Sequence, residues 1–113
     1  MSRDDAYLLD ILQAARLALE YIHEATVEAF VEDVRLQDSV IRRLEIIGEA
    51  ARRVSEAARL EYPQLPWREM VAMRNIVIHE YNNLDLTIIW DAVKNDLPPL
   101  IEALQQIVPP DSP

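Results

Sequence analysis

The chain of 113 residues is half hydrophobic and 27% charged, which allows one packed domain and excludes two. With no cysteine and a single glycine, Gly48, it lacks the means for disulfides, thiolate metal sites or a glycine-rich phosphate loop, and a sheet with tight hairpins is nearly excluded. The net charge of −9 argues against general binding to nucleic acid, and the lack of a membrane-spanning apolar run or a signal peptide leads us to expect a cytoplasmic protein that contacts no membrane.

The first predicted helix runs from about Asp4 to Ala25. Asp4 and Asp5 lie in its first turn, where the helix dipole favours negative charge. Thr26 is expected to cap a short helical turn from Val27 to Val31. The apolar residues of the long helix recur at steps of three and four, which places them on one face: Leu8, Ile11, Ala15, Ala18, Ile22 and Ala25.

The second helix is predicted from Asp38, or one turn earlier, to Leu60. Gly48 lies beside its apolar stripe, and we expect another helix to approach closely there, because an exposed glycine inside a helix would only cost stability. The stripe again follows helical spacing: Val40, Leu44, Ile47, Ala51, Val54 and Ala58.

Prolines at 63 and 66 separate this helix from a third, predicted from Trp67 to His79. After a loop at 82–85, Asp85 or Thr87 is expected to cap the fourth helix. Apolar spacing continues through the prolines at 98 and 99 to residue 107, so a kink or short break is expected there rather than a chain reversal. Residues 109–113 read as a non-helical tail.

The pattern therefore predicts an all-α fold, a single domain over residues 1–108. Its architecture is expected to be an up-and-down bundle of four main helices with short turns. Because long apolar stripes in so small a bundle favour burial against a second copy, we expect a homodimer.

The chain has two histidines, of which His23 is expected to lie on the surface. His79 follows Arg74 and Asn75 in an otherwise apolar segment, and Tyr81 comes two residues later. Histidine moves protons at neutral pH, and arginine stabilises charge on a phosphodiester. Together they suffice to cleave RNA without a metal, because the ribose 2′-hydroxyl attacks the adjacent phosphorus. DNA lacks this hydroxyl and is not an expected substrate.

On a regular helix Arg74 and His79 are about 140° apart. They meet only if the helix ends or unwinds before His79, or if a second chain supplies part of the site. The structural alternative is that Arg74 pairs with a glutamate while His79 caps the end of its helix. No acids and histidines have metal-ligand spacing, so no metal or cofactor is expected.

Six of the ten arginines lie in residues 35–60, the only segment with a positive net charge, whereas residues 1–34 have a net charge of −6. Trp67 and Trp90 are expected to anchor the core or an interface. The charged residues of the second helix alternate in sign at helical spacing, which is typical of a solvated ion-pair ladder; alternatively some of the arginines line an RNA groove. These residues are Arg42, Glu45, Glu49, Arg52, Arg53, Glu56 and Arg59.

The segment 74–81 resembles the R-x4-H-x-Y signature of the HepT-like toxins, which are helical ribonucleases of the HEPN superfamily. Segments 38–51, 65–70 and 96–100 with Trp90 resemble the other blocks of that family. The resemblance implies a helical homodimer whose motifs face a cleft at the two-fold interface, and a metal-independent endoribonuclease. It also implies that Arg74 orients and neutralises the scissile phosphate, that His79 takes part in proton transfer and that Asn75 makes a supporting polar contact.

The resemblance further implies a protein partner, a cognate minimal nucleotidyltransferase antitoxin. This partner transfers AMP from ATP to the motif tyrosine, here Tyr81, as in a type VII toxin–antitoxin pair. The added bulk and negative charge would keep RNA out of the cleft, and the acidic first helix would serve antitoxin contact or solubility. The competing interpretations are a non-catalytic subunit that presents nucleotide or substrate to a nucleotidyltransferase, and a structural dimerisation module.

Overall fold

The computed structural model describes residues 2–79 and 85–108, without the side chains of residues 75–79. Within these ranges the chain contains helices and no strand, which confirms the all-α prediction. The elements are α1 (Arg3–Ile22), α2 (Val27–Glu32), α3 (Val34–Arg53), α4 (Glu56–Glu61), α5 (Trp67–His79), α6 (Leu86–Asp91), the π-helical turn η2 (Ala92–Asp96) and α7 (Leu97–Gln105).

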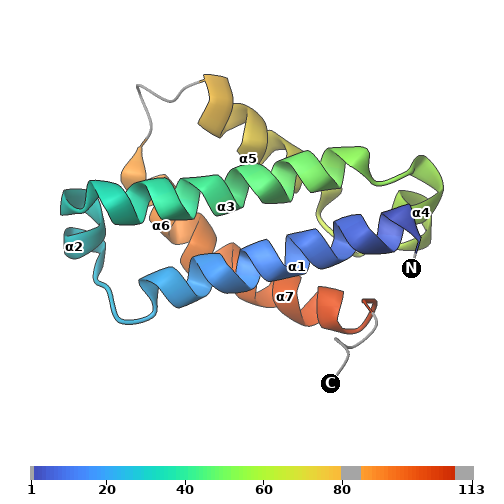
Figure 1. Cartoon of the computed structure of the whole chain (residues 1–113), viewed down its shortest axis with the longest axis horizontal. Coiled ribbons are helices and arrows are strands. Elements are labelled where there is room, and N and C mark those ends of the chain that lie inside the picture. Colours follow the sequence, from blue (N-terminus) through green and yellow to red (C-terminus); the bar gives the residue numbers. More distant parts are fainter. Residues whose placement is uncertain (1, 80–84, 109–113) are drawn as a thin grey trace.

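The long helical runs alternate in direction, as an up-and-down bundle requires (Figure 1). α1 and α3 lie side by side and antiparallel, and α5 packs along α3. The elements α6, η2 and α7 form one continuous run that packs against α1. None of the helices in the described ranges is both long enough and apolar enough to cross a membrane.

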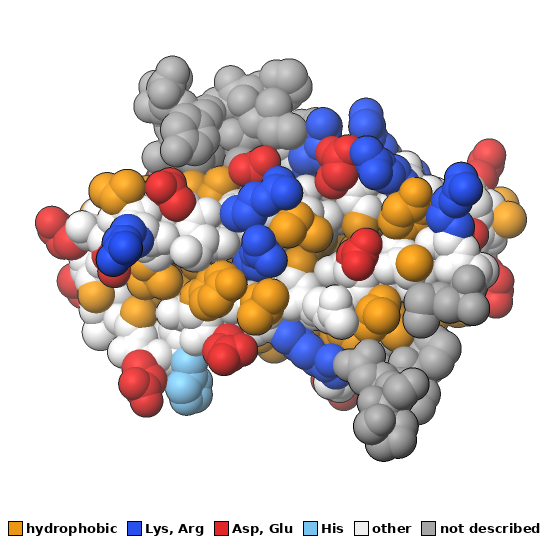
Figure 2. All heavy atoms as spheres, viewed as in Figure 1, with side chains coloured by type: hydrophobic (Ala, Val, Ile, Leu, Met, Phe, Trp, Pro, Cys, Tyr) orange, Lys and Arg blue, Asp and Glu red, His pale blue; other side chains and the backbone are white. Residues whose placement is uncertain are grey.

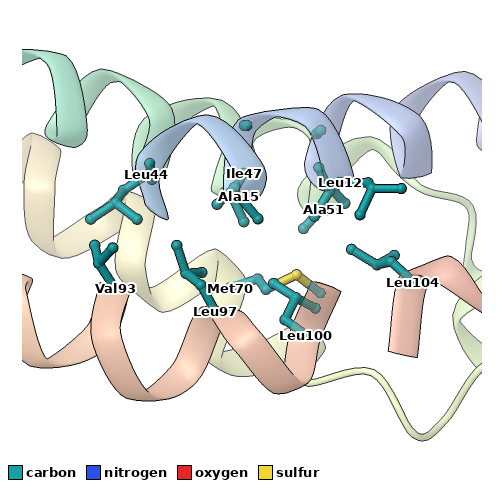
Figure 3. Close-up of a cluster of buried hydrophobic side chains, with 14 of the residues drawn as sticks. Leu12, Ala15, Leu44, Ile47, Ala51, Met70, Val93, Leu97, Leu100 and Leu104 are labelled. Atoms are coloured by element: carbon teal, nitrogen blue, oxygen red, sulfur yellow. The ribbon is translucent and has the colours of Figure 1, made fainter. Parts of the chain in front are cut away.

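The core lies where the apolar stripes of α1 and α3 face the α6–α7 run and α5 (Figure 3). Among the described residues every buried side chain is hydrophobic, and no polar or charged side chain is buried. Full burial of a leucine or isoleucine side chain stabilises a fold by about 1.5–3 kcal/mol. The side chains labelled in Figure 3 are Leu12, Ala15, Leu44, Ile47, Ala51, Met70, Val93, Leu97, Leu100 and Leu104.

Helix starts that the sequence predicted have side-chain caps. The Thr26 hydroxyl accepts a hydrogen bond from the backbone N–H of Ala29 at 3.1 Å, and α2 then runs one residue further than predicted. The Asp85 carboxylate accepts one from the N–H of Thr87 at 2.9 Å, so Asp85 is the cap of α6. His23 is exposed at the end of α1, as predicted.

The predicted extent of the second helix is wrong at its C-terminal end. It begins at Val34, one turn before Asp38, but it ends at Arg53, and the separate helix α4 follows. Val54 has extended backbone, yet both Val54 and Ala58 are buried. Because the apolar spacing of four continues across the break, the hydrophobic pattern does not reveal it.

The break is held by a contact between two helices distant in sequence. The Ser55 hydroxyl accepts a hydrogen bond from the N–H of Ala58 at 3.1 Å and so caps α4. The carboxylate of Asp4, in the first turn of α1, accepts hydrogen bonds from the Ser55 backbone N–H at 2.9 Å and from its hydroxyl at 2.6 Å. Asp4 lies in the first turn of α1, as predicted, and it also binds the residue that caps α4.

The predicted irregularity near the double proline takes the form of the π-helical turn η2. Leu97 donates its backbone N–H to the carbonyl of Ala92, five residues back. Pro98 and Pro99 have no N–H to donate, and they follow at the start of α7. The run does not reverse direction, as expected, and α7 ends at Gln105, while the predicted tail at 109–113 lies outside the described residues.

Both tryptophans have structural contacts, as predicted. Trp90 is 9% exposed, and its ring centroid lies 5.5 Å from that of Phe30. The Trp67 indole N–H donates to the carbonyl of Tyr62 at 2.9 Å, which joins the start of α5 to the end of α4. These contacts anchor Trp90 in the core and Trp67 at the junction of α4 and α5.

Candidate functional site

Of the four predicted site residues, Arg74 is the one whose side chain is described. Asn75 and His79 belong to the backbone of α5, and Tyr81 lies outside the described residues. The helix continues through His79, so it does not end or unwind before that position. Positions 74 and 79 therefore stay about 140° apart on the helix, and α5 of one chain does not bring them onto a common face.

Arg74 lies where α5 crosses α3 at Gly48. A Cβ atom added to Gly48 would come 2.1 Å from the Cβ of Arg74 and 2.9 Å from the backbone carbonyl oxygen of Met70. Carbon atoms in contact are normally about 3.5–4.0 Å apart. The predicted close approach at Gly48 is confirmed, and the missing side chain lets Arg74 lie directly against the middle of α3.

The residue after this glycine holds the arginine. Arg74 Nε donates to Glu49 Oε2 at 2.6 Å, in a pair whose side chains are 20% and 35% exposed. The other carboxylate oxygen of Glu49 lies 3.0 Å from Arg53 Nη2 and 3.7 Å from Arg52 Nη2. The hydrogen bond from Arg74 is the main cause that lowers the pKa of Glu49 below its ordinary value. Pairing of Arg74 with a glutamate, the structural alternative for this residue, is thus confirmed.

The remaining arginines of the predicted ladder differ in their partners. Arg42 pairs loosely with Glu45, with 3.9 Å between nitrogen and oxygen. The Arg59 side chain instead reaches the last turn of α3, where Nη2 donates to two backbone carbonyl oxygens at 2.9 Å. Its guanidinium carbon lies 5.8 Å from the ring centroid of Trp67. Arg59 is therefore a helix cap and is not available to a groove on α3.

A cavity of about 320 Å³ opens beside Arg74, between α1, α3 and α5. Figure 2 shows arginine side chains gathered over α3 on this face, with apolar side chains exposed between them. The arginines that line the cavity are matched in number by carboxylates, so its lining carries no net charge. The lining residues are Tyr7, Asp10, Arg42, Glu45, Ile46, Glu49, Ala50, Arg53 and Arg74.

Sequence reasoning missed three contributors to this cavity. Tyr7 and Asp10 come from the acidic first helix, which was assigned to partner contact or solubility, and Glu49 was assigned to the ladder. Helical spacing does not show that Glu49, the residue after Gly48, contacts α5. Tyr7 reaches the same cavity because α1 packs on α3. Within the described part of the chain, no three His, Asp or Glu residues are grouped so as to hold a metal ion.

Helix α5 thus has Arg74 at the wall of a cavity and a histidine at position 79, five residues further along. The chain belongs to the HepT-like ribonuclease family, whose model matches residues 11–107. This confirms the resemblance found in the motif segment.

Relatives from three organisms are similar over nearly their whole length. “Probable ribonuclease HepT” of Thermococcus cleftensis is 43% identical over 94 residues, which cover 83% of this chain and 86% of the relative. “Putative RNase MJ1380” of Methanocaldococcus jannaschii is 41% identical over 100 residues, covering 87% and 92%. “Putative RNase TTE0752” of Caldanaerobacter subterraneus is 34% identical over 102 residues, covering 90% and 91%. No solved structure matches the chain significantly.

Proposed function

We propose that this protein is a metal-independent endoribonuclease and the toxin of a type VII-like toxin–antitoxin pair. Membership of the HepT-like ribonuclease family supports the activity. The observation that carries the site is Arg74, fixed by Glu49 at the wall of a cavity of nucleotide size. An arginine held through Nε uses one of the five donors of its guanidinium in that bond, and the planar group suits a phosphodiester.

The chemistry needs only the substrate and two side chains. The ribose 2′-oxygen forms a bond to the adjacent phosphorus while the bond from phosphorus to the 5′-oxygen breaks, and the proton lost by the first oxygen is balanced by one gained by the second. His79 takes part in this proton transfer. Arg74 orients the phosphate and neutralises the charge that builds on its oxygens, with Asn75 as a supporting polar contact.

A second copy of the chain is proposed to complete the site. Since α5 remains helical through His79, one chain leaves positions 74 and 79 about 140° apart. In a two-fold dimer the motif of one protomer faces that of its partner, so an arginine from one chain meets a histidine from the other. The cleft between them is the proposed RNA site.

Regulation is proposed to act on Tyr81. Its hydroxyl oxygen attacks the α-phosphorus of ATP on a cognate minimal nucleotidyltransferase, and pyrophosphate leaves. The resulting AMP group adds bulk and negative charge that repel RNA. The acidic outer face of α1 is the proposed contact for that antitoxin.

Cleavage of RNA in the presence of EDTA tests the activity and its site together. We expect the wild type to cut, and Arg74→Ala and His79→Ala each to lose about 100-fold or more in rate, with helical content unchanged by circular dichroism. Arg68→Ala and His23→Ala change the same residue types at exposed positions outside the cavity and serve as controls. Full activity in both site variants would overturn the assignment, and an inactive wild type would favour the non-catalytic binding subunit.

Mixing the two inactive variants tests the composite site. A heterodimer of Arg74→Ala and His79→Ala chains keeps one intact site, so after subunit exchange we expect about a quarter of the wild-type activity. No recovery in a mixture shown to contain heterodimers contradicts the two-chain site.

Intact mass measured after incubation with the antitoxin and ATP tests the modification. We expect the wild type to gain whole AMP units and Tyr81→Phe to gain none. An equal gain in Tyr81→Phe rejects this tyrosine as the acceptor.

A further inference from the structure

We propose that the cavity between α1, α3 and α5 is a subsite for the nucleotide next to the scissile phosphate, with the base stacked on Tyr7 and phosphates of the strand contacted by the arginines of α3. This inference rests on the proposed ribonuclease function and extends it to how the RNA strand is held. It gives α1 a role in RNA binding, which the acidic net charge of this helix would not lead one to expect.

Continuity with the site is the first argument. Arg74, which would contact the scissile phosphate, is itself part of the cavity lining. A volume of about 320 Å³ lies at the lower end of the range for small-molecule sites, about 300–1,000 Å³, which suits one base with part of its sugar. A strand that passes over Arg74 therefore finds room for one nucleotide immediately beside it.

The balance of charge indicates a nucleotide rather than a free anion. The cavity lining contains three arginines and three carboxylates: Arg42, Arg53 and Arg74 with Asp10, Glu45 and Glu49. Such a lining does not concentrate small anions, but it suits a ligand that has both a phosphate and hydrogen-bond donors on a base. Arg42 and Arg53 are eleven positions apart, about 16 Å along α3. This distance exceeds the spacing of neighbouring phosphates, so each arginine would contact a different phosphate of the strand.

Tyr7 provides the stacking surface. It is half-buried, packs against the core on one side, and is the aromatic member of the cavity lining on the other. A ring held in this way presents a fixed apolar surface, and stacking on such rings tolerates every base. Single-stranded RNA is commonly bound by stacking of unpaired bases on aromatic side chains.

Asp10 provides a selection among bases. It is exposed at the cavity, and its carboxylate has no hydrogen bond or ion pair within the described part of the chain. A carboxylate only accepts hydrogen bonds, so it favours bases with an exocyclic amino group, such as cytosine, over uracil, which has none.

Binding of a non-cleavable ligand tests the subsite separately from catalysis. The probe is a fluorescent single-stranded 2′-O-methyl hexanucleotide, whose blocked 2′-oxygen prevents cleavage, and the readout is fluorescence anisotropy at low salt. We expect Tyr7→Leu, which keeps apolar packing but removes the ring, to weaken binding about tenfold, while Tyr7→Phe binds like the wild type. Tyr21→Leu, on the exposed part of α1 outside the cavity, is the control and should bind normally.

Charge and base selection are tested with the same probe. The double variant Arg42→Gln with Arg53→Gln should bind about tenfold more weakly and less steeply with salt, whereas Arg35→Gln with Arg68→Gln, exposed and outside the cavity, should change binding much less. Wild type should prefer a cytosine over a uracil hexamer by about fivefold, and Asp10→Asn should lose that preference.

The outcomes separate this inference from the proposed function. If the wild type cleaves RNA but Tyr7→Leu and the double arginine variant bind and cut like the wild type, the subsite is wrong and the ribonuclease stands. If the wild type binds the probe through these residues but never cleaves RNA, the cavity is a nucleotide-binding site and the proposed ribonuclease function is wrong. A wild type that does not bind the probe at all overturns the subsite.

Discussion

Two carboxylates in this molecule each join a pair of helices, and they do so through different kinds of partner. Asp4 of α1 accepts hydrogen bonds from the backbone N–H and the hydroxyl of Ser55, so it fixes the main chain where α3 has ended and α4 begins. Glu49 of α3 accepts a hydrogen bond from the Arg74 side chain, so it fixes a guanidinium at the wall of a cavity. The pKa of each carboxyl is lowered by its partner, yet the first contact shapes the fold and the second orients a candidate catalytic group.

Loss of Glu49 should affect RNA cleavage far more than loss of Asp4. Glu49→Ala removes the hydrogen bond that holds Arg74 through Nε, and it also removes a negative charge from the cavity. We expect the rate of the chemical step, kcat, to fall about 10- to 100-fold because orientation is lost, while KM falls because RNA is repelled less. Steady-state kinetics on a short oligoribonucleotide separate the two constants.

Asp4→Ala is the matched control for this experiment, because it removes a carboxylate from an interhelical contact far from Arg74 in the sequence. It should leave kcat unchanged once the protein is folded. Glu49→Gln keeps an acceptor oxygen and should retain more activity than Glu49→Ala. Equal kinetic constants in Glu49→Ala and the wild type would show that Glu49 is an ordinary surface ion pair.

The close contact at Gly48 sets how near Arg74 comes to Glu49. In Gly48→Ala the added methyl meets the Arg74 Cβ and a backbone carbonyl. Overpacking of this kind costs about 1–3 kcal/mol, whereas the better helix propensity of alanine contributes about 1 kcal/mol. We expect a net loss of stability in urea unfolding together with reduced cleavage, and a more stable, fully active Gly48→Ala would contradict the close crossing.

Much of this crossing was predictable from the sequence. The period of α3 and a single glycine beside its stripe predict a close helix partner, and Pro66 with the apolar pattern predicts α5 at Trp67–His79. The identity of the glutamate that pairs with Arg74 was not predictable, because the ladder of α3 offers several at equivalent spacing. That choice depends on the angle at which α5 crosses α3, which no local pattern contains.

Ser55 is the partner of Asp4, and changes to it should affect folding stability but not cleavage. Ser55→Ala removes the cap of α4 and one partner of Asp4, so we expect unfolding free energy to fall by about 1 kcal/mol, with cleavage unchanged. Ser39→Ala, whose hydroxyl donates to the Arg35 carbonyl within exposed α3, is the control and should be nearly neutral. A loss of cleavage in Ser55→Ala that exceeds its loss of folded protein would show that the two regions are coupled.

The break at Ser55 also shows why the sequence misplaced the end of the second helix. The Ser55 cap acts within three residues, as do the caps at Thr26 and Asp85 that the sequence predicted. It was missed because the apolar residues on both sides of the break keep helical spacing, and because the carboxylate that binds Ser55 lies 51 positions earlier in the chain.

The smallest expected effect is in the pH dependence of stability. Hydrogen bonds from the Ser55 hydroxyl and N–H lower the pKa of Asp4 in the folded state. A carboxyl with a depressed folded pKa stabilises the fold above its unfolded pKa of about 3.9 and loses this contribution as the pH falls through the folded value. We therefore expect Asp4→Asn to lower the urea midpoint slightly at pH 7, and the difference from the wild type to shrink below about pH 4.

The stability of Glu49→Gln should depend on pH in the same direction as that of Asp4→Asn. The pKa of Glu49 is lowered chiefly by Arg74, so its difference from the wild type should also disappear in acid, and high salt should reduce it at pH 7. Salt should affect Asp4→Asn less, since its partners are neutral. Identical salt responses would remove the distinction between the two carboxylates.

The π-helical turn η2 has a consequence for how the chain tolerates changes of length. Because Leu97 bonds five residues back to Ala92, this stretch contains one residue more than α-helical pairing uses. Deleting one residue there would restore regular pairing, but it would rotate α7 by about 100° relative to α6 and turn its buried leucines away from α1. The extra residue thus sets the rotation of α7 relative to α6, so that the apolar faces of both helices point to the same core.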